Sequence, residues 1–433
     1  MQVLRTKCRF YLVVCFMICF FSAAAGHAAQ REVHFVVNAG VDRVPLYEDF
    51  FAAFEEKTGI KVIFQQAPGP QVGKWEQVIT QIAGGLSPDI VGAVSVEFAQ
   101  YAEKGLLLPI DDYIVQDRVD MGQLLPTLVE ALQWRGAQYM LPYGASAIGL
   151  FINPQLYDEA GLALPPSQWN QSGWTWDTFL NSARKMTKID GAGVPTQFGL
   201  AGHLTDAWIS LPYNWGGDWI SADYREFAGD KPGALAALQA QQDIRYTYHI
   251  APLSGESGGG TNGFMNGTAA TAVLGTWSLQ SVIDSPRPLR MIPWFKVGNN
   301  VPKGTINPMG IALLSTAPHQ EEAWEFVKFA TTDPTGNYLY ALAAGALPGH
   351  PVAYRRWQVE MQVTKPTLNI GAFVQQVAEY PAIINIRKVS TFNEIDAIMV
   401  PMFNQITNNQ ISPEQGMAQI KPVIQALIDL VGF

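Results

Sequence analysis

The sequence predicts an α/β fold with more than one domain. Strand-like and helix-like patterns alternate along the first hundred residues, as in a sheet covered by helices. The chain has 433 residues, which is too long for one core of ordinary size. Hydrophobic residues make up 48% and charged residues 15%, so the chain belongs among well-packed globular proteins.

Residues 1–29 have the layout of a secretory signal peptide. A positive start is followed by an unbroken apolar run over residues 10–21 and by small residues over 23–29 that suit a cleavage site. An uncleaved anchor is the alternative, but the apolar core is short for a bilayer and the small residues follow it directly. We therefore expect an exported, cleaved, soluble protein.

Removing this segment changes the chemistry of the mature chain. All three cysteines lie in it, at Cys8, Cys15 and Cys19, so the mature protein is expected to have no disulfide and no cysteine metal site. The segment also carries three positive charges and no acidic ones, so the formal net charge moves from −9 to −12. This acidity argues against nucleic acid or an anionic membrane as a partner.

The mature chain begins with a predicted β-α-β unit. Residues 32–38 are β-rich, a helix starts at Pro45 and ends at Gly59, and a second strand covers residues 60–65. Such a unit folds naturally with parallel strands and a crossover helix.

The alternation continues over the next forty residues. A helix carries Trp75 and Ile82 and ends at 84–85, a strand covers 90–91, and another helix over 98–102 ends at Gly105. This order predicts an open sheet whose binding crevice lies at the carboxyl ends of its strands.

Residues 141–162 are the predicted hinge of the molecule. An apolar strand over 148–152 is closed by Asn153-Pro154, and a short helix follows that Gly161 ends. Gly144 is expected to supply conformational freedom there.

The sequence predicts further helices, strands and loops in the rest of the chain. They are a helix over 173–188 started by Thr175, an aromatic loop over 208–219 that presents its rings, a flexible Ser/Gly loop over 254–263, a strand over 269–274, a turn over 307–310 before a strand over 311–314, a helix over 321–330 ended by Asp333-Pro334, and a helical last hundred residues.

The sequence contains no strong catalytic, phosphate-binding or metal-binding motif. Ser257 has the letters of a nucleophile elbow but lies in the predicted Ser/Gly loop instead of a strand-to-helix turn, and residues 69–74 form a phosphate-loop pattern one residue short. The five histidines beyond residue 29 share no helix face at metal-ligand spacing. Carboxylates such as Asp42, Asp89, Glu97 and Asp218 remain possible acid/base pairs. We expect no enzyme, no metal and no cofactor.

Aromatic residues in predicted loops are the main positive signal. They are Tyr143, Tyr213, Trp215, Trp219 and Trp277. Core packing is one interpretation of each ring, and stacking on the C–H face of a sugar is the other. Trp277 favours the second, because Gly275 before it is expected to let the backbone turn the ring out of its strand.

Several segments, taken in order, resemble the extracellular solute-binding proteins of ABC transporters, the family typified by maltose-binding protein. They are FFAAFEEKTGIKVIF from Phe50, AGGLSPDIV from Ala83, AEKGLLLPIDDYI from Ala102, LPYGAS from Leu141, GLFINPQLYDEAGL from Gly149, TWDTFLNSARKMTK from Thr175, FMNGTAATAVLGTW from Phe264 and AWEFVKFATTDP from Ala323. The resemblance covers the mature chain to about residue 350.

The resemblance implies a two-lobed periplasmic-binding-protein fold of type II. Each lobe would be an open, mainly parallel sheet flanked by helices, and a hinge of several segments would join the lobes. One lobe would hold 30–143 plus 305–342, and the other 144–304 plus 343–433. Ligand would bind between them, and the lobes would close over it.

The resemblance also implies where ligand contacts lie. The positions carried over are Asn38, Asp42, Arg43, Ser95, Glu97, Tyr143, Trp215, Asp218, Trp277, Asn307 and Met309. The family often has Tyr-Asn-Lys where this chain has Ile152-Asn153-Pro154, so a sugar-contacting tyrosine is missing. We therefore expect the ligand to be held mainly by Trp215 and Trp277.

The resulting hypothesis is a monomeric periplasmic binding protein for a sugar or oligosaccharide that docks on a membrane permease. Two alternatives stay open. One is a secreted glycan hydrolase. The other is the same binding fold for a different solute, such as a glycerol-phosphate ester or a polyamine.

Overall fold

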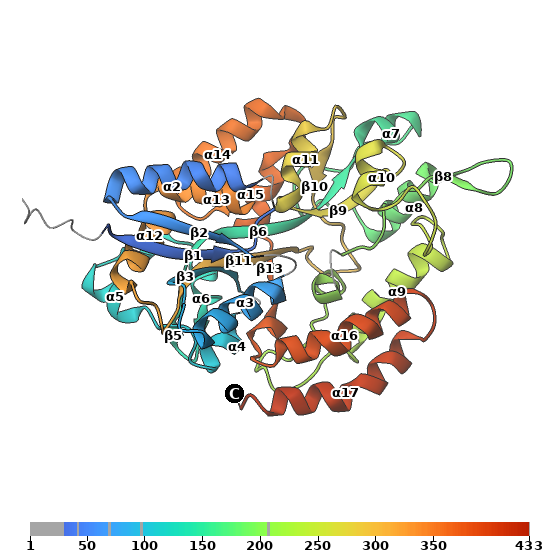
Figure 1. The fold of residues 1–433 in the computed structure, drawn as a ribbon. Helices are drawn as coiled ribbons and strands as arrows, with labels where there is room; N and C mark the ends of the chain where they lie inside the picture. Colours follow the sequence, from blue (N-terminus) through green and yellow to red (C-terminus); the bar gives the residue numbers. More distant parts are fainter. Residues whose placement is uncertain (1–29, 41–42, 68–70, 96–97, 206–207, 433) are drawn as a thin grey trace, which may run out of the picture.

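The computed structural model describes residues 30–432 except 41–42, 68–70, 96–97 and 206–207. The predicted signal peptide, with its three cysteines, lies outside the described residues. A central sheet runs through the molecule, with α2, α13 and α14 on one side of it and α3, α4 and α6 on the other (Figure 1). The α/β prediction is confirmed.

The N-terminal part of the sheet is the β-α-β unit that the sequence predicts. β1 (Glu32–Val37) pairs in parallel with β2 (Lys61–Gln66), and α2 (Val44–Thr58) connects them. α2 ends at Gly59, which has φ 70°, so the left-handed position falls on the residue that adopts it without steric cost. α3 (Gln71–Ala83) then leads to β3 (Ile90–Val94), which pairs in parallel with the other edge of β1.

β6 (Met140–Ile152) is the long strand at the centre of the molecule. All 13 of its residues are buried. Its first half pairs with β11 (Gly304–Leu313), and its second half pairs with β9 (Thr271–Gly275) and β10 (Arg290–Ile292). Asn153 then caps α7 (Pro154–Glu159) by accepting a hydrogen bond from the Gln155 amide. The predicted strand, turn and helix are confirmed.

The sheet differs from the expected pair of mainly parallel sheets. One nine-stranded sheet has the order β10-β6-β11-β3-β1-β2, with β9, β12 (Leu347–Pro348) and β13 (Pro381–Ile383) attached to β6 or β11. Among the described strands of this sheet, the parallel pairs are β1–β2, β1–β3 and β11–β13, and the other pairs are antiparallel. The sheet is mixed because β6 and β11 run antiparallel and each continues into both halves of the molecule.

Aromatic side chains form the core between β1, α2 and the helices after β11. Phe35, Phe50 and Phe326 are fully buried, and the ring centroids of Phe35 and Phe326 lie 5.1 Å apart. α12 (Gln320–Thr332) and α13 (Pro334–Ala344) supply this packing, and Asp333 caps α13 by accepting hydrogen bonds from the Thr335 and Gly336 amides. The predicted stop at Asp333-Pro334 is thus also a helix start.

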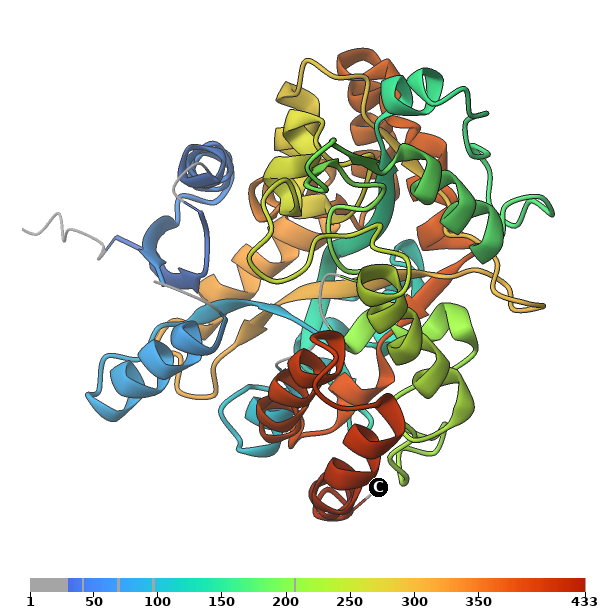
Figure 2. The ribbon, with the colours of Figure 1, turned by 90° about the vertical axis from the view of Figure 1, so that its right-hand side faces the viewer.

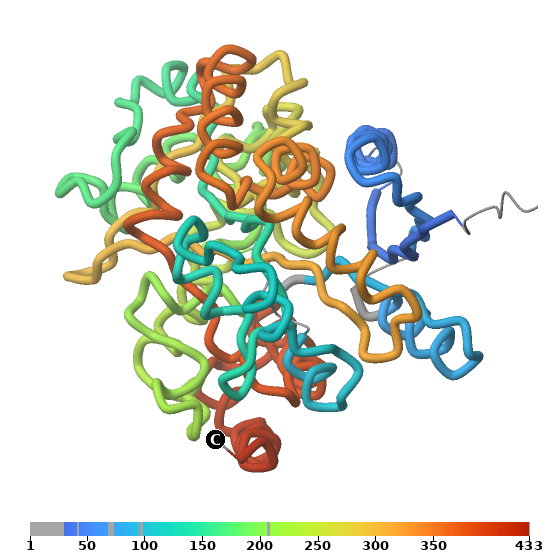
Figure 3. Tube along the Cα trace, turned by 90° about the vertical axis from the view of Figure 1, so that its left-hand side faces the viewer, coloured from blue at the N-terminus to red at the C-terminus, as the bar shows by residue number. Residues whose placement is uncertain are grey.

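The last hundred residues are largely helical, as predicted. Besides α13, their α-helices are α14 (Pro351–Thr364), α15 (Ile370–Ala378), α16 (Phe392–Thr407) and α17 (Pro413–Asp429). Figures 2 and 3 view the molecule from opposite sides, and both place α17 at the lower edge, away from α2.

The other elements are short or connect those above. They are α4 (Phe98–Glu103), α5 (Asp111–Gln116), α6 (Pro126–Glu130), β4 (Gln133–Trp134), β5 (Ala137–Gln138), α8 (Trp176–Met186), β7 (Lys188–Ile189), β8 (Pro195–Gln197), α9 (Pro232–Tyr246), α10 (Gly260–Asn266), α11 (Leu279–Asp284), and the 3-10 helices η2 (Met121–Gln123), η3 (Trp208–Ser210), η4 (Pro212–Trp215), η5 (Thr276–Ser278), η6 (Pro366–Leu368) and η7 (Asn385–Lys388).

Three local predictions are wrong. Residues 260–263 belong to α10, although the composition favoured a flexible loop throughout 254–263. Residues 307–310 lie inside β11, with an irregular register between Met309 and Gly310, because pairing with β6 outweighs the local turn signal. The loop over 208–219 does not present all its rings, since Trp208 and Trp219 pack edge-to-face in the core.

Gly144 is required for a reason other than conformational freedom. A Cβ built on it would lie 2.0 Å from the carbonyl oxygen of Leu347, because β12 pairs against β6 at this point. Its role is to let two backbones approach closely.

We predict that Gly144→Ala lowers the free energy of unfolding by about 2 kcal/mol, since the added methyl group meets rigid backbone. Gly173→Ala is the matched control, because no atom lies within 4 Å of its added Cβ. Urea unfolding measures both. Equal free energies of unfolding for the two variants would contradict the close backbone contact between β12 and β6 at Gly144.

Candidate functional site

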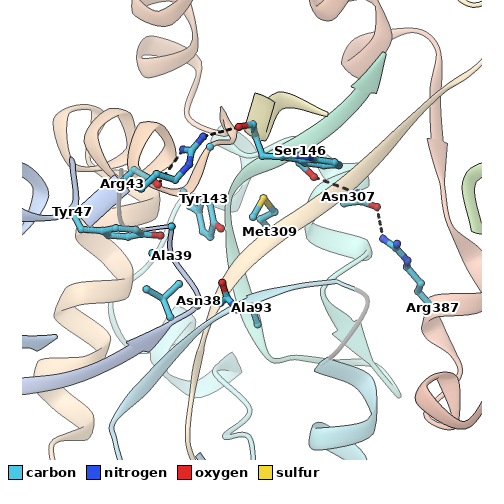
Figure 4. A pocket seen from close by; sticks show the side chains of 17 residues that line it. Asn38, Ala39, Arg43, Tyr47, Ala93, Tyr143, Ser146, Asn307, Met309 and Arg387 are labelled. Atoms are coloured by element: carbon cyan, nitrogen blue, oxygen red, sulfur yellow. Dashed lines mark hydrogen bonds between the residues drawn. The ribbon is translucent and has the colours of Figure 1, made fainter. Parts of the chain in front are cut away.

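A cavity of about 380 Å³ lies where the two halves of β6 meet. Its walls come from the end of β1, the start of α2, β6, η5, β11, the end of α13 and η7 (Figure 4). These segments are far apart in the sequence. The long pairing of β6 with β11 brings them to one place.

Trp277 is the exposed ring of this cavity. The side chain keeps 46% of its surface exposed although indole is a large apolar group. Gly275 has an ordinary extended backbone, with φ −93°, so the expected backbone turn is not why glycine stands there. A Cβ on Gly275 would lie 2.2 Å from the Trp277 ring, which shows that the indole folds back over its own strand.

Tyr143 lines the same cavity but is 97% covered. It packs edge-on against Tyr340, with ring centroids 4.6 Å apart. Only a small part of its ring is therefore available to a bound molecule.

A chain of polar groups crosses the cavity floor. Asn307 of β11 donates from Nδ2 to Oγ of Ser146 on β6, at 3.3 Å, and its Oδ1 accepts a hydrogen bond from Nη1 of Arg387 (Figure 4). Asn38 adds another amide at the end of β1. The floor thus offers amide, hydroxyl and guanidinium groups, which bind hydroxyl-rich molecules well.

Arg387 is a site residue that sequence reasoning missed. It lies in η7, within the last eighty residues, where helical content was the sole pattern. No local motif marks it, because its place in the cavity depends on a contact with Asn307, 80 positions earlier in the chain.

The cavity brings together six of the predicted site residues. They are Asn38, Arg43, Tyr143, Trp277, Asn307 and Met309. Ser95 is buried and its amide donates to the Pro308 carbonyl, at 2.8 Å, so it supports the strand beside the cavity. Asp42 and Glu97 lie outside the described residues.

Trp215 and Asp218 are not among the lining residues of the cavity, although the sequence analysis placed both in the site. Trp215 packs edge-on against Trp176 and Phe295, with centroids 5.8 and 6.1 Å away. Asp218 accepts a hydrogen bond from Nδ2 of Asn385, at 2.9 Å, and burial raises the pKa of its carboxyl group. Because Asn385 begins η7, Asp218 helps to place Arg387.

The described residues hold no group of three or more His, Cys, Asp and Glu side chains that could bind a metal ion. All helices in the described part of the chain fall short of the length and apolar character that a membrane span requires.

Comparison with known proteins places this geometry in a family. Residues 41–336 match the family described as bacterial extracellular solute-binding protein. A maltotriose-binding protein of Pyrococcus abyssi is 24% identical over 294 residues, which cover 67% of this chain and 60% of that protein. The chain thus matches less than two thirds of that relative's length. Putative binding proteins of Brucella abortus are 26% identical over 151 residues, or 35% of each chain.

Solved structures show the same fold over nearly the whole chain. An ABC substrate-binding protein of Listeria monocytogenes, solved with cycloalternan, has a TM-score of 0.79 at 22% identity and matches over 92% of this chain and 99% of that one. UgpB of Mycobacterium tuberculosis, solved with glycerophosphocholine, has a TM-score of 0.77 at 18% identity. The match covers 92% of this chain and 98% of that one.

The two tryptophans that sequence analysis paired should behave differently on truncation. We predict that Trp215→Ala lowers the free energy of unfolding by about 2 to 3 kcal/mol, because its ring contacts are lost. Trp277→Ala should cost about 1 kcal/mol or less, because half of that ring already faces solvent. Thermal and urea unfolding without ligand measure both. If Trp277→Ala lowers the free energy of unfolding more than Trp215→Ala does, Trp277 is a core residue.

Proposed function

The chain belongs to the bacterial extracellular solute-binding proteins, and we propose that it is the periplasmic component of an ABC importer, capturing a sugar or oligosaccharide. It has the two-lobed, type II fold of periplasmic binding proteins. In this proposal the signal peptide is cleaved, and the exported monomer carries its ligand to a membrane permease.

The exposed indole of Trp277 in a cavity with polar groups on its floor is the observation that carries the proposal. A pyranose ring has an apolar C–H face and a rim of hydroxyl groups. The indole matches the face, and the amides of Asn38 and Asn307 with the Ser146 hydroxyl match the rim.

Binding is proposed to close the cleft. One lobe would hold 30–143 plus 305–342 and the other 144–304 plus 343–433, so that β6 and β11 both cross between them. Ligand contacts made by both lobes in the shut form would shift the population toward that form. The crossing strands would act as the hinge.

A phosphate ester is the second candidate ligand. The guanidinium groups of Arg43 and Arg387 line the cavity, whereas no carboxylate does so among the described residues. The neighbour solved with glycerophosphocholine shows that this fold can take such a ligand.

We predict that a thermal-shift screen of saccharides and glycerol-phosphate esters identifies a saccharide that stabilises the protein, by roughly 2.7 kcal/mol at a hundredfold excess over its dissociation constant. Trp277→Ala should abolish the shift, because the stacking surface is lost. A shift with phosphate esters alone would replace the sugar by the second candidate.

Chromatography of the same saccharide mixtures tests the enzymatic alternative. The binding function predicts that every saccharide is recovered intact after prolonged incubation. Turnover of any of them would contradict it.

A further inference from the structure

Arg43 occupies an unusual place for a cation. It is the N-cap residue of α2, and its side chain caps none of the amides there. The N-terminus of a helix carries partial positive charge, so a guanidinium at this position is disfavoured unless other groups compensate it. The compensating groups lie on another helix.

The Arg43 guanidinium is bound at the C-terminal end of α13. Its Nη1 donates to the carbonyl oxygens of Leu342, at 3.0 Å, and Ala343, at 3.3 Å. The last carbonyls of a helix lack partners within the helix and carry partial negative charge. Gly345 ends α13 with φ 68°, and a Cβ on it would lie 2.7 to 2.8 Å from the guanidinium atoms. The absence of a side chain at Gly345 therefore makes room for Arg43.

The second nitrogen of the same group reaches across the cavity. Nη2 of Arg43 donates to the main-chain carbonyl of Trp277, at 3.1 Å. Beside it, the Thr276 hydroxyl donates to the Gly345 carbonyl, at 2.9 Å. Trp277 follows β9, which pairs with the far half of β6, whereas α2 packs with β1 and α13. These two hydrogen bonds therefore tie the segment that carries the indole to the opposite wall.

We propose that Arg43 is a positioning residue, a latch that fixes the Trp277 main chain across the cleft. Three of the five N–H groups of its guanidinium donate to main-chain carbonyls, which hold the group in one place. The effect of the latch on binding rests on the proposed function above. Its effect on Trp277 does not, because the three hydrogen bonds join groups of the protein alone.

The latch predicts how Arg43 affects the association and dissociation rates of a ligand. The indole keeps its place against a stacked ligand only while the Trp277 main chain is fixed by Arg43, so the latch acts mainly on how long a bound ligand stays. A hydrogen bond with a charged donor is stronger than a neutral one. Loss of the latch should therefore raise the dissociation rate far more than it lowers the association rate.

Fluorine NMR of protein labelled with 5-fluorotryptophan tests the latch without ligand. The Trp277 resonance is assigned by its loss in Trp277→Phe. Arg43→Met removes the donors, and Gly345→Ala displaces the guanidinium while leaving Arg43 in the chain. Both should shift the Trp277 resonance and leave the other tryptophan resonances in place. An unchanged Trp277 resonance in both variants would overturn the proposal.

Gly59→Ala is the matched control. Gly59 has φ 70° at a helix end, like Gly345, but no atom lies within 4 Å of its added Cβ. It carries the same backbone strain without touching the latch, so its Trp277 resonance should match that of the wild type. If Gly59→Ala shifts that resonance as Gly345→Ala does, general strain explains the effect and the latch is wrong.

Stopped-flow binding of maltotriose tests the kinetic statement. Arg43→Met should raise the dissociation rate roughly tenfold and change the association rate by less than about threefold. A loss confined to the association rate would contradict the latch. If the wild type does not bind maltotriose, maltotriose is not the ligand of the proposed function. The NMR experiment still tests whether Arg43 positions Trp277, because it uses no ligand.

Discussion

The structure depends on one strand that is buried along its whole length. The first half of β6 pairs with β11 and its second half pairs with β9 and β10, so one strand joins the two halves of the sheet. Buried backbone amides and carbonyls need partners, and here two different sets of strands supply them to one continuous segment. The strand is therefore both a core element and the link between the two parts of the molecule, which puts any cleft between those parts beside β6.

The cavity follows from that link. Ser146 of β6, Asn307 of β11 and Arg387 of η7 form one chain of hydrogen bonds although they span 241 positions of the sequence. Asp218 acts behind them, through Asn385, to hold η7. Arg43 ties Trp277 to α13 on the other wall. Most of the charged groups near the cavity thus orient its wall segments, and the indole and the amides remain for a ligand.

Local signals in the sequence predict the elements well. Prolines at helix starts and glycines at helix ends mark α2, α7 and α13, because capping is decided by neighbouring residues. The site is predicted in part, since six of its residues are positions that the family resemblance implies. The rest depends on distant contacts. No local pattern in the sequence indicates that Trp215 packs on Phe295 or that Arg387 reaches Asn307.

A crystal structure of the protein with the saccharide that stabilises it most tests the central claim directly. The account predicts a sugar ring lying flat on the Trp277 indole, with its hydroxyl groups within hydrogen-bond distance of Asn38, Ser146 or Asn307. A ligand bound elsewhere, or one in the cavity that leaves the indole uncovered, would contradict it.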